Sequence, residues 1–307
     1  MPVGPEDITA AAKRVSGRVR RTPILELDPF GTARVAAKLE FLQHTNSFKP
    51  RGAFNKLLSS DVPPAGVIAA SGGNFGSAVA YAAREVGVSA EIFIPSTSPE
   101  AKVARVRGYG ANVTIVDGYW AEAQAAAVER QAETGALAMH PFDQPEVIAG
   151  QGTIGIELDE QVPDLDTVLV AIGGGGLIAG IAAWFQRRVR VVGVEPVSCA
   201  TMTAALATGE PVVAPVGGVA ADSLGSARVG DNTFEIVRDQ VDRVVLVEDD
   251  AIREAQRAYW NEFRLIVEPG GAATLAALFS SAYLAAAGER VVVLASGANC
   301  DPTTVIG

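Results

Sequence analysis

Short apolar runs alternate along the chain with longer amphipathic segments. The runs are typical of buried strands, and the segments, in which apolar residues recur every three to four positions, are typical of helices. In the first series the pattern predicts strands at 67–70, 91–95 and 113–116 and helices at 77–85, 102–109 and 121–133. Strands that alternate with helices in this way predict a parallel sheet covered by helices.

A second series follows in the rest of the chain. It predicts strands at 168–172, 189–194, 244–247 and 291–295 and helices at 177–186, 251–263 and 272–287. We expect the segment before the first series to join this second sheet. The prediction is therefore an α/β fold with two lobes, a large one from residues 1–63 and 141–307 and a small inserted one from residues 64–140. In such folds ligands bind outside the carboxyl ends of the strands.

Composition and charge narrow the possible partners. The chain has 307 residues, enough for two lobes, and a formal net charge of −10. A chain this acidic offers no basic face to nucleic acid or to anionic lipid, so a small-molecule ligand is expected. The two cysteines and two histidines form no spaced metal-ligand motif. Because the N-terminal residues also lack an apolar signal core, we expect a cytoplasmic protein with reduced thiols.

One segment could be taken for a membrane span, because residues 167–185 carry no charge. The run contains four consecutive glycines, however, and its pattern predicts a short strand, a loop and a helix. We therefore expect no membrane span.

Lys49 lies between Phe48 and Pro50, at the point where a helical pattern begins. Proline suits the first position of a helix and disfavours helical dihedral angles in the residue before it. Lys49 is therefore expected in an extended loop, aimed by the start of a rigid helix. Considered alone, such a lysine is more often a solvated surface charge, but the motifs below favour a lysine that forms a bond.

A glycine-rich loop follows the strand expected at 168–172 and precedes a helix. It consists of Gly173, Gly174, Gly175 and Gly176, with Leu177 next. Glycines let successive N–H groups converge on one point, and the helix N-terminus adds partial positive charge. The loop therefore predicts a phosphate site that needs no basic residue, with a permissive tight turn as the alternative.

The same loop also fits a second class of protein. Gly174, Gly176 and Ala179 match the G-x-G-x-x-[GA] dinucleotide fingerprint, and Glu195 ends the next strand near the usual spacing of a ribose-binding acid. This pattern alone would indicate a nicotinamide-dependent oxidoreductase. That hypothesis leaves Lys49 and the remaining motifs without a role.

Another loop of small residues connects a predicted strand to a predicted helix. It contains Ser71, Gly72, Gly73, Asn74 and Gly76. Small residues expose backbone amides to an anion such as a substrate carboxylate, and the Asn74 side chain can hydrogen-bond an oxygen. A loop that merely caps the helix is the alternative.

Two weaker motifs lie at other strand ends. The hydroxyl of Ser296, after the strand at 291–295, suits a ring nitrogen, although an ordinary turn explains it better when it is considered alone. Glu195, with Cys199 and Thr201 close in sequence, offers a carboxylate beside backbone and hydroxyl oxygens, which suits a hard cation. A carboxylate that caps a helix is the alternative.

Together and in this order, the motifs resemble those of the threonine/serine dehydratase and serine racemase family, whose members carry pyridoxal 5′-phosphate (PLP) on fold type II. The lysine motif and the four-glycine loop are highly specific as a pair. The matching segments span nearly the whole chain and are 21–23, 46–53, 71–76, 173–177, 229–234, 268–269 and 296–299.

The resemblance implies a role for each matching position. Lys49 is the expected Schiff-base lysine and catalytic base, and Phe48 is expected near the pyridine ring. Asn74 is expected to bind the ring hydroxyl, and Ser296 the pyridine nitrogen. Residues 173–177 match the phosphate site and residues 71–76 the loop for the substrate carboxylate. The resemblance also implies a homodimer and a cation site, whose residues are Glu195, Cys199 and Thr201.

Departures from the family pattern refine the predicted reaction. Gly72 stands where serine racemases have a catalytic serine, so loss of water from L-threonine, L-serine or a related 3-hydroxy amino acid, giving a 2-oxo acid and ammonia, is predicted rather than racemisation. β-Replacement remains a further alternative. Thr201 replaces a carboxylate of the racemases, which favours a monovalent cation such as K⁺ or Na⁺. Phe75 and Ser223 are expected to reshape the substrate pocket. With no regulatory domain expected after Ser296, end-product inhibition is not expected.

Overall fold

The computed structural model describes residues 3–28 and 30–306 and contains two sheets. The larger sheet has the strand order β1-β2-β10-β7-β8-β9, and only the β1–β2 pair is antiparallel. Its strands are β1 (Ile24–Glu26), β2 (Arg34–Leu39), β7 (Thr167–Ala171), β8 (Arg190–Pro196), β9 (Arg243–Val247) and β10 (Arg290–Ala295). As expected, the N-terminal segment contributes strands to this sheet.

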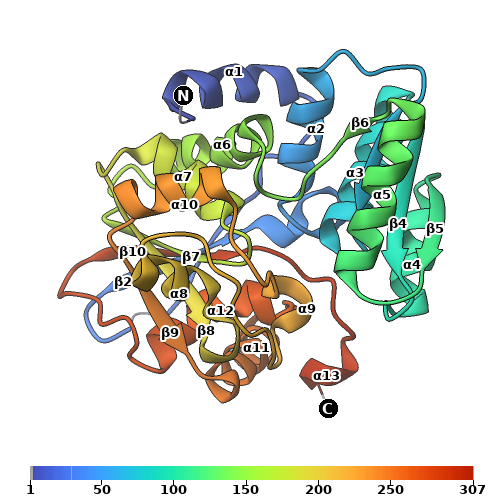
Figure 1. Ribbon diagram of the computed structural model, residues 1–307. Helices are drawn as coiled ribbons and strands as arrows, with labels where there is room; N and C mark the ends of the chain where they lie inside the picture. Colours follow the sequence, from blue (N-terminus) through green and yellow to red (C-terminus); the bar gives the residue numbers. More distant parts are fainter. Residues whose placement is uncertain (1–2, 29, 307) are drawn as a thin grey trace.

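The smaller sheet is wholly parallel, with the order β5-β4-β3-β6. Its strands are β3 (Val67–Ala70), β4 (Ala90–Pro95), β5 (Asn112–Val116) and β6 (Leu137–Ala138). Three helices connect them, namely α3 (Asn74–Val86), α4 (Glu100–Gly108) and α5 (Trp120–Thr134). We call this sheet with its helices the small lobe, and the other sheet with its helices the large lobe (Figure 1). The predicted fold class is confirmed, whereas the predicted domain limits stay a prediction.

The other helices cover the large sheet or join the lobes. The short 3₁₀ segments are η1 (Glu40–Leu42), η2 (His44–Asn46) and η3 (Val197–Cys199). The α-helices are α1 (Pro5–Val15), α2 (Pro50–Leu58), α6 (Pro145–Gln161), α7 (Gly176–Phe185), α8 (Thr201–Thr208), α9 (Ala221–Leu224), α10 (Asp231–Gln240), α11 (Asp249–Phe263), α12 (Pro269–Phe279) and α13 (Thr303–Ile306). Helix α2 packs against both α6 and α3, so it stands where the two lobes meet.

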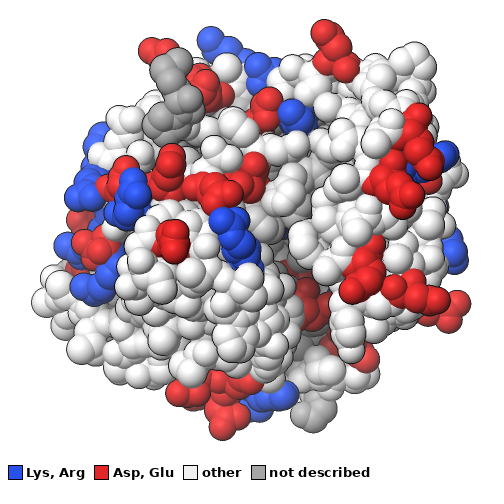
Figure 2. Space-filling model, in the orientation of Figure 1, with Lys and Arg blue, Asp and Glu red and all other residues white. Residues whose placement is uncertain are grey.

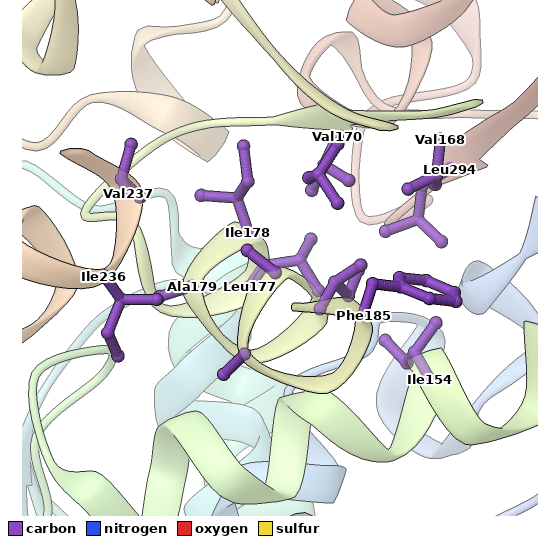
Figure 3. Packing of buried hydrophobic residues seen from close by; sticks show 14 of the residues in the cluster. Ile154, Val168, Val170, Leu177, Ile178, Ala179, Phe185, Ile236, Val237 and Leu294 are labelled. Carbon is purple, nitrogen blue, oxygen red and sulfur yellow. The ribbon is translucent and has the colours of Figure 1, made fainter. Parts of the chain in front are cut away.

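Helix α7 is buried in the core of the large lobe. Its side chains Ile178 and Phe185 pack with Val170 of β7 and Ile154 of α6 (Figure 3). The helices α6 and α7 cross closely at two glycines, since a Cβ atom on Gly180 would lie 2.6 Å from the backbone nitrogen of Gly152. The uncharged run is therefore a strand, a loop and a core helix, as predicted. Within the described ranges, no helix has the length and apolar character that a membrane span requires.

One predicted helix is shorter than expected. The pattern extended the helix at 272–287, but α12 ends at Phe279. Ser281 then takes a positive φ of 59°, and the amide of Tyr283 turns back to donate to the carbonyl of Ala277. The reversal buries Tyr283, whose apolar ring the periodicity had assigned to a continuing helix. The sequence pattern did not predict the following α-helices and strands: α1, β1, β2, β6, α6, α8, α9, α10 and α13.

Candidate active site

A cavity of about 410 Å³ lies between the lobes. The space-filling view shows a furrow between the two lobes (Figure 2). Its walls come from the segments after β3, β4, β7 and β10, which are carboxyl ends of parallel strands, as predicted. Among the predicted site residues, the cavity is lined by Phe48, Lys49, Ser71, Gly72, Gly73, Asn74, Gly173, Gly174, Gly175, Gly176, Leu177 and Ser296.

Lys49 opens helix α2 and lines the cavity, but its backbone differs from the expectation. It has φ −55° and ψ −32°, which is helical rather than extended. The extended prediction was therefore wrong. Lys49 is the N-cap residue of α2, and its carbonyl accepts a hydrogen bond from the amide of Ala53 at 3.2 Å. This bond holds a conformation that the following proline disfavours.

The backbone ties Lys49 to the segment that contains Ser296. The amide of Phe48 donates to the carbonyl of Ser296 at 3.1 Å, and Ser47 forms an antiparallel bridge with Gly297. The carbonyl of Asn46 accepts from the amide of Ala298 at 3.0 Å. These main-chain bonds hold the lysine and the buried serine at a fixed spacing, although the two residues are far apart in the sequence.

The amine of Lys49 is held in a partly apolar environment. Its Nζ donates to the carbonyl of Pro141 at 2.9 Å and lies 5.0 Å from the ring centroid of Phe48 and 5.7 Å from that of Phe75. Burial lowers the pKa of Lys49 to about 8, and the nearby Glu268 carboxyl partly offsets that shift. A lysine with this pKa supplies a neutral amine near neutral pH, as a nucleophile or a base requires.

The four-glycine loop is tightly packed, since a Cβ on Gly174, Gly175 or Gly176 would lie 2.8 Å or less from a neighbouring atom. A Cβ on Gly174 would overlap the ring of Phe142, and one on Gly176 would lie 2.8 Å from the carbonyl oxygen of Phe142. Gly175 has φ +97°, where other residues are strained. Helix α7 starts directly after it without a side-chain cap. The first N–H groups of a helix have no partner within the helix, so this loop offers them to an anion.

Asn74 begins helix α3 at the opposite wall. Its Nδ2 donates to Oε1 of Glu268 at 2.8 Å, and its Oδ1 accepts from Nδ2 of Asn299 at 2.7 Å. Asn74 is not the helix cap, because Gly73 occupies the N-cap position, and the Asn74 side chain reaches the large lobe instead. The neighbouring Gly76 sits so tightly against the carbonyl of Ser71 that a Cβ there would overlap it.

The space beside Gly72 is already filled. A Cβ on Gly72 would overlap the hydroxyl of Ser98 and would lie 3.0 Å from Cγ2 of Ile94. Ser98 follows β4 and itself lines the cavity. A hydroxyl from a different loop thus stands next to the position where a side chain at residue 72 would begin.

Ser296 and Ser223 occupy the remaining wall of the large lobe. Ser296 is buried at the end of β10 and lines the cavity. Ser223 also lines it, and its Oγ accepts from the amide of Gly270 at 3.0 Å. Phe75 also lines the cavity and is buried, with its ring near the amine of Lys49.

Glu195 caps a helix away from this cavity. Its two oxygens accept from the amides of Met202 at 2.7 Å and Thr203 at 2.9 Å, at the start of α8. Burial raises its pKa, and these bonds oppose the shift. The thiol of Cys199 and the hydroxyl of Thr201 each donate to backbone carbonyls nearby. Within residues 3–28 and 30–306, His, Cys, Asp and Glu side chains form no cluster of three that could hold a metal ion.

Two groups in the site were missed by the sequence analysis as functional residues. Glu268 was noted only within a motif, yet it is a buried carboxyl on the cavity wall. Burial raises its pKa to about 7, and the hydrogen bond from Asn74 opposes that shift. Asn299 belongs to the motif after β10, but the sequence alone indicated no role for it. In sequence, an acid before Pro269 indicates a helix cap, so no local signal showed that Glu268 is buried.

The fold and this cavity define a class of enzyme, and comparison with known families agrees. The model of a family described as pyridoxal-phosphate dependent enzyme matches residues 15–297. The chain belongs to this family of pyridoxal-phosphate dependent enzymes, and the predicted membership is confirmed.

Individual relatives are similar over nearly the entire chain. An L-threonine ammonia-lyase from Geobacter sulfurreducens is 42% identical over 97% of this chain and 76% of its own length. The catabolic L-threonine dehydratase TdcB of Escherichia coli K12 is 36% identical over 99% of this chain and 95% of its own. Among solved structures, maize serine racemase superposes with a TM-score of 0.94 at 34% identity, covering 100% of this chain and 96% of that one.

Proposed function

We propose that this protein is a PLP-dependent ammonia-lyase that converts a 3-hydroxy amino acid, such as L-threonine or L-serine, into a 2-oxo acid and ammonia. The observation that carries the proposal is Lys49, a lysine of lowered pKa facing a cavity whose other wall is a glycine loop at a helix N-terminus. The relatives named for threonine ammonia-lyase and dehydratase support this reaction.

The cavity fits the cofactor in charge and in shape. A side chain at Gly174 or Gly176 would collide with Phe142, which lines the cavity, and the N–H groups of the loop suit a phosphate. In this proposal Lys49 bonds to the cofactor, Asn74 binds its ring hydroxyl and Ser296 its ring nitrogen. Phe48 packs along the ring, because its own ring lies next to the lysine amine.

Lys49 and the loop at residues 71–76 have different roles in the proposed elimination. When bound, PLP supplies an electron sink for the bond that breaks at the α-carbon. Lys49 takes the α-proton, and its lowered pKa of about 8 raises the fraction of its amine that is neutral near pH 7. The amides of residues 71–76 hold the substrate carboxylate. The substrate loses a proton from its α-carbon and hydroxide from its β-carbon, which together make water, and the resulting enamine hydrolyses to the 2-oxo acid and ammonia.

The reaction is tested with a panel of 3-hydroxy amino acids. Purified protein should be yellow and should release ammonia and 2-oxo acid in equal amounts from L-threonine or L-serine. Ammonia should be released only when PLP is present. The substrate that remains should contain no detectable D-enantiomer. A colourless protein that PLP cannot reconstitute would contradict the proposal.

A methyl group in the glycine loop should weaken cofactor binding. Gly174→Ala forces the new Cβ against the Phe142 ring, so either the loop or the ring must move. We expect the Kd for PLP to rise by about 10-fold to 100-fold, corresponding to about 1.4–3 kcal/mol. Fluorescence titration of the apoprotein measures this. Gly108→Ala is the matched control, because a Cβ at Gly108 meets no atom within 4 Å and its φ is not positive.

Capture of PLP by the apoprotein should follow the ionisation of Lys49. Because the pKa of Lys49 is lowered to about 8, the neutral fraction of its amine should rise about tenfold from pH 7 to pH 9. The association rate, measured by stopped-flow absorbance, should rise with it and then level off. Glu268→Gln removes the offsetting charge and should move the midpoint to lower pH. A rate that keeps rising toward pH 10.5 would show an unperturbed lysine.

Racemisation is the alternative that a structural neighbour favours, since the maize relative is named serine racemase. Gly72→Ser alone should not create this activity, because Ser98 already fills the space beside residue 72. Gly72→Ser combined with Ser98→Ala makes room for the new hydroxyl and should raise D-serine formation from L-serine by at least about tenfold. Chiral chromatography measures it. Equal D-serine formation by the wild type and both variants would show that residue 72 does not decide between the reactions.

Two other reactions are alternatives to the elimination. β-Replacement is tested by adding a thiol nucleophile to the assay. A nicotinamide enzyme is disfavoured because Glu195 is fully buried and its oxygens bind the amides of α8, not a ribose. A homodimer, a cytoplasmic location and a K⁺ or Na⁺ site at Glu195, Cys199 and Thr201 are also part of the proposal. Sedimentation and a comparison of K⁺, Na⁺ and Li⁺ buffers test the first and last.

A further inference from the structure

Four polar side chains form a continuous chain of hydrogen bonds beside the cavity. Arg105 of α4 donates from Nη1 to Oδ1 of Asn299. Asn299 donates from Nδ2 to Oδ1 of Asn74 at 2.7 Å, and Asn74 donates from Nδ2 to Oε1 of Glu268 at 2.8 Å. Along this chain the residues alternate between the small lobe and the large lobe.

Each link fixes the direction of the next. Arginine is only a donor, so Asn299 must present its oxygen to Arg105 and its nitrogen to Asn74. The second N–H of that nitrogen donates to the carbonyl of Thr45 at 2.8 Å. At the other end Glu268 also accepts from the backbone amide of Asn299 at 3.0 Å. The sequence of donors and acceptors is thus consistent from the guanidinium to the carboxylate, and only one orientation of each amide satisfies it.

This arrangement leaves one N–H of Asn74 unused. The nitrogen carries two hydrogens and gives one to Glu268, while the oxygen is occupied by Asn299. Asn74 also lines the cavity. A free asparagine could turn its amide over and present an acceptor in place of a donor. The hydrogen bond from Asn299 prevents this rotation, because in the turned amide the NH₂ group of Asn74 would face the NH₂ group of Asn299.

We infer that Asn299 and Arg105 are positioning residues that hold the amide of Asn74 with a donor directed at the ring hydroxyl oxygen of the cofactor. The inference rests on the proposed function for the identity of that ligand. Because all three hydrogen bonds of this chain cross between the lobes, the donor is set only when both lobes stand as they do in this structure. Arg105 touches neither cofactor nor substrate and acts through Asn299 and Asn74.

The test measures cofactor binding rather than turnover. Arg105→Ala removes an exposed side chain and should leave the fold intact. We expect it to weaken PLP binding about threefold to tenfold, the usual effect of losing one hydrogen bond, and to shift the visible absorption band of the bound cofactor. Asn299→Ala should have a larger effect, about 10-fold to 100-fold. Arg105→Lys retains a donor and should restore much of the wild-type affinity and spectrum. Arg107→Ala, on the same helix and also exposed, is the control and should match the wild type.

The outcomes separate this inference from the proposed function. Wild-type affinity and an unshifted spectrum in both Arg105→Ala and Asn299→Ala would overturn the inference alone. So would variants that melt at lower temperature as apoprotein but bind PLP unchanged, since the chain would then serve only stability. A wild-type protein that fails to bind PLP would overturn the proposed function and this inference with it.

Discussion

Lys49→Ala is expected to lower ammonia release from L-threonine or L-serine by about 10³-fold or more, because it removes both the covalent anchor of the cofactor and the base for the α-proton. Borohydride treatment of the wild type should attach a pyridoxyl group to the peptide that contains Lys49, as mass spectrometry would show. The variant should acquire no such label.

The matched control is Lys56→Ala, in the same helix, where the lysine pairs with Glu146 outside the cavity. It should keep the label and most of the activity. Turnover by Lys49→Ala within tenfold of the wild type would rule out the role proposed for this lysine, and labelling of another lysine would move the site elsewhere.

Arg51→Met is expected to destabilise the apoprotein by about 3–5 kcal/mol, because it leaves a buried carboxylate without its partner. Arg51 is fully buried and donates to both oxygens of Glu40 at 2.8 Å and to Oε1 of Glu157 at 2.7 Å. Lys38 completes the cluster by donating to the other oxygen of Glu157 at 2.5 Å. Urea denaturation should show a lower midpoint with an unchanged slope.

Two further variants sharpen this prediction. Arg34→Met breaks the pair with Asp164, in which both side chains are more than half exposed, and should cost at most about 1 kcal/mol. Arg51→Met with Glu40→Leu removes both charges of one pair and should recover much of the lost stability. A single Arg51→Met change that costs less than the Arg34→Met control would contradict the account of a buried cluster.

Much of the fold could be predicted because its strands carry local signals. The strand at 67–70 and the strand at 291–295 are uninterrupted apolar runs, and both occur where expected, with β10 beginning one residue earlier. The helix α12 was predicted too long because the alanines after it favour a helix, whereas the segment forms a mostly exposed turn. Its end is decided by the burial of Tyr283, which is a tertiary contact.

The site was predictable where function constrains the backbone and much less where it depends on packing. The glycine loop and Lys49 are marked by residue types that few other structures require. The hydrogen-bond chain through Asn299 joins residues that are 194 to 225 positions apart, so no local pattern shows it. Ser98 is a further example, since only the packed structure reveals that its hydroxyl fills the space beside Gly72.

The position of β10 in the large sheet means that the active site can form only late in the synthesis of the chain. This strand is the last of the sheet to be synthesised, and it lies between β2 and β7. Directly after it, the carbonyl of Ser296 accepts a hydrogen bond from the amide of Phe48, the residue before Lys49. A nascent chain that has not yet released β10 from the ribosome has a lysine but no fixed site around it. Cofactor uptake should therefore mark the completed molecule, and a translation-arrested fragment ending before β10 should remain colourless.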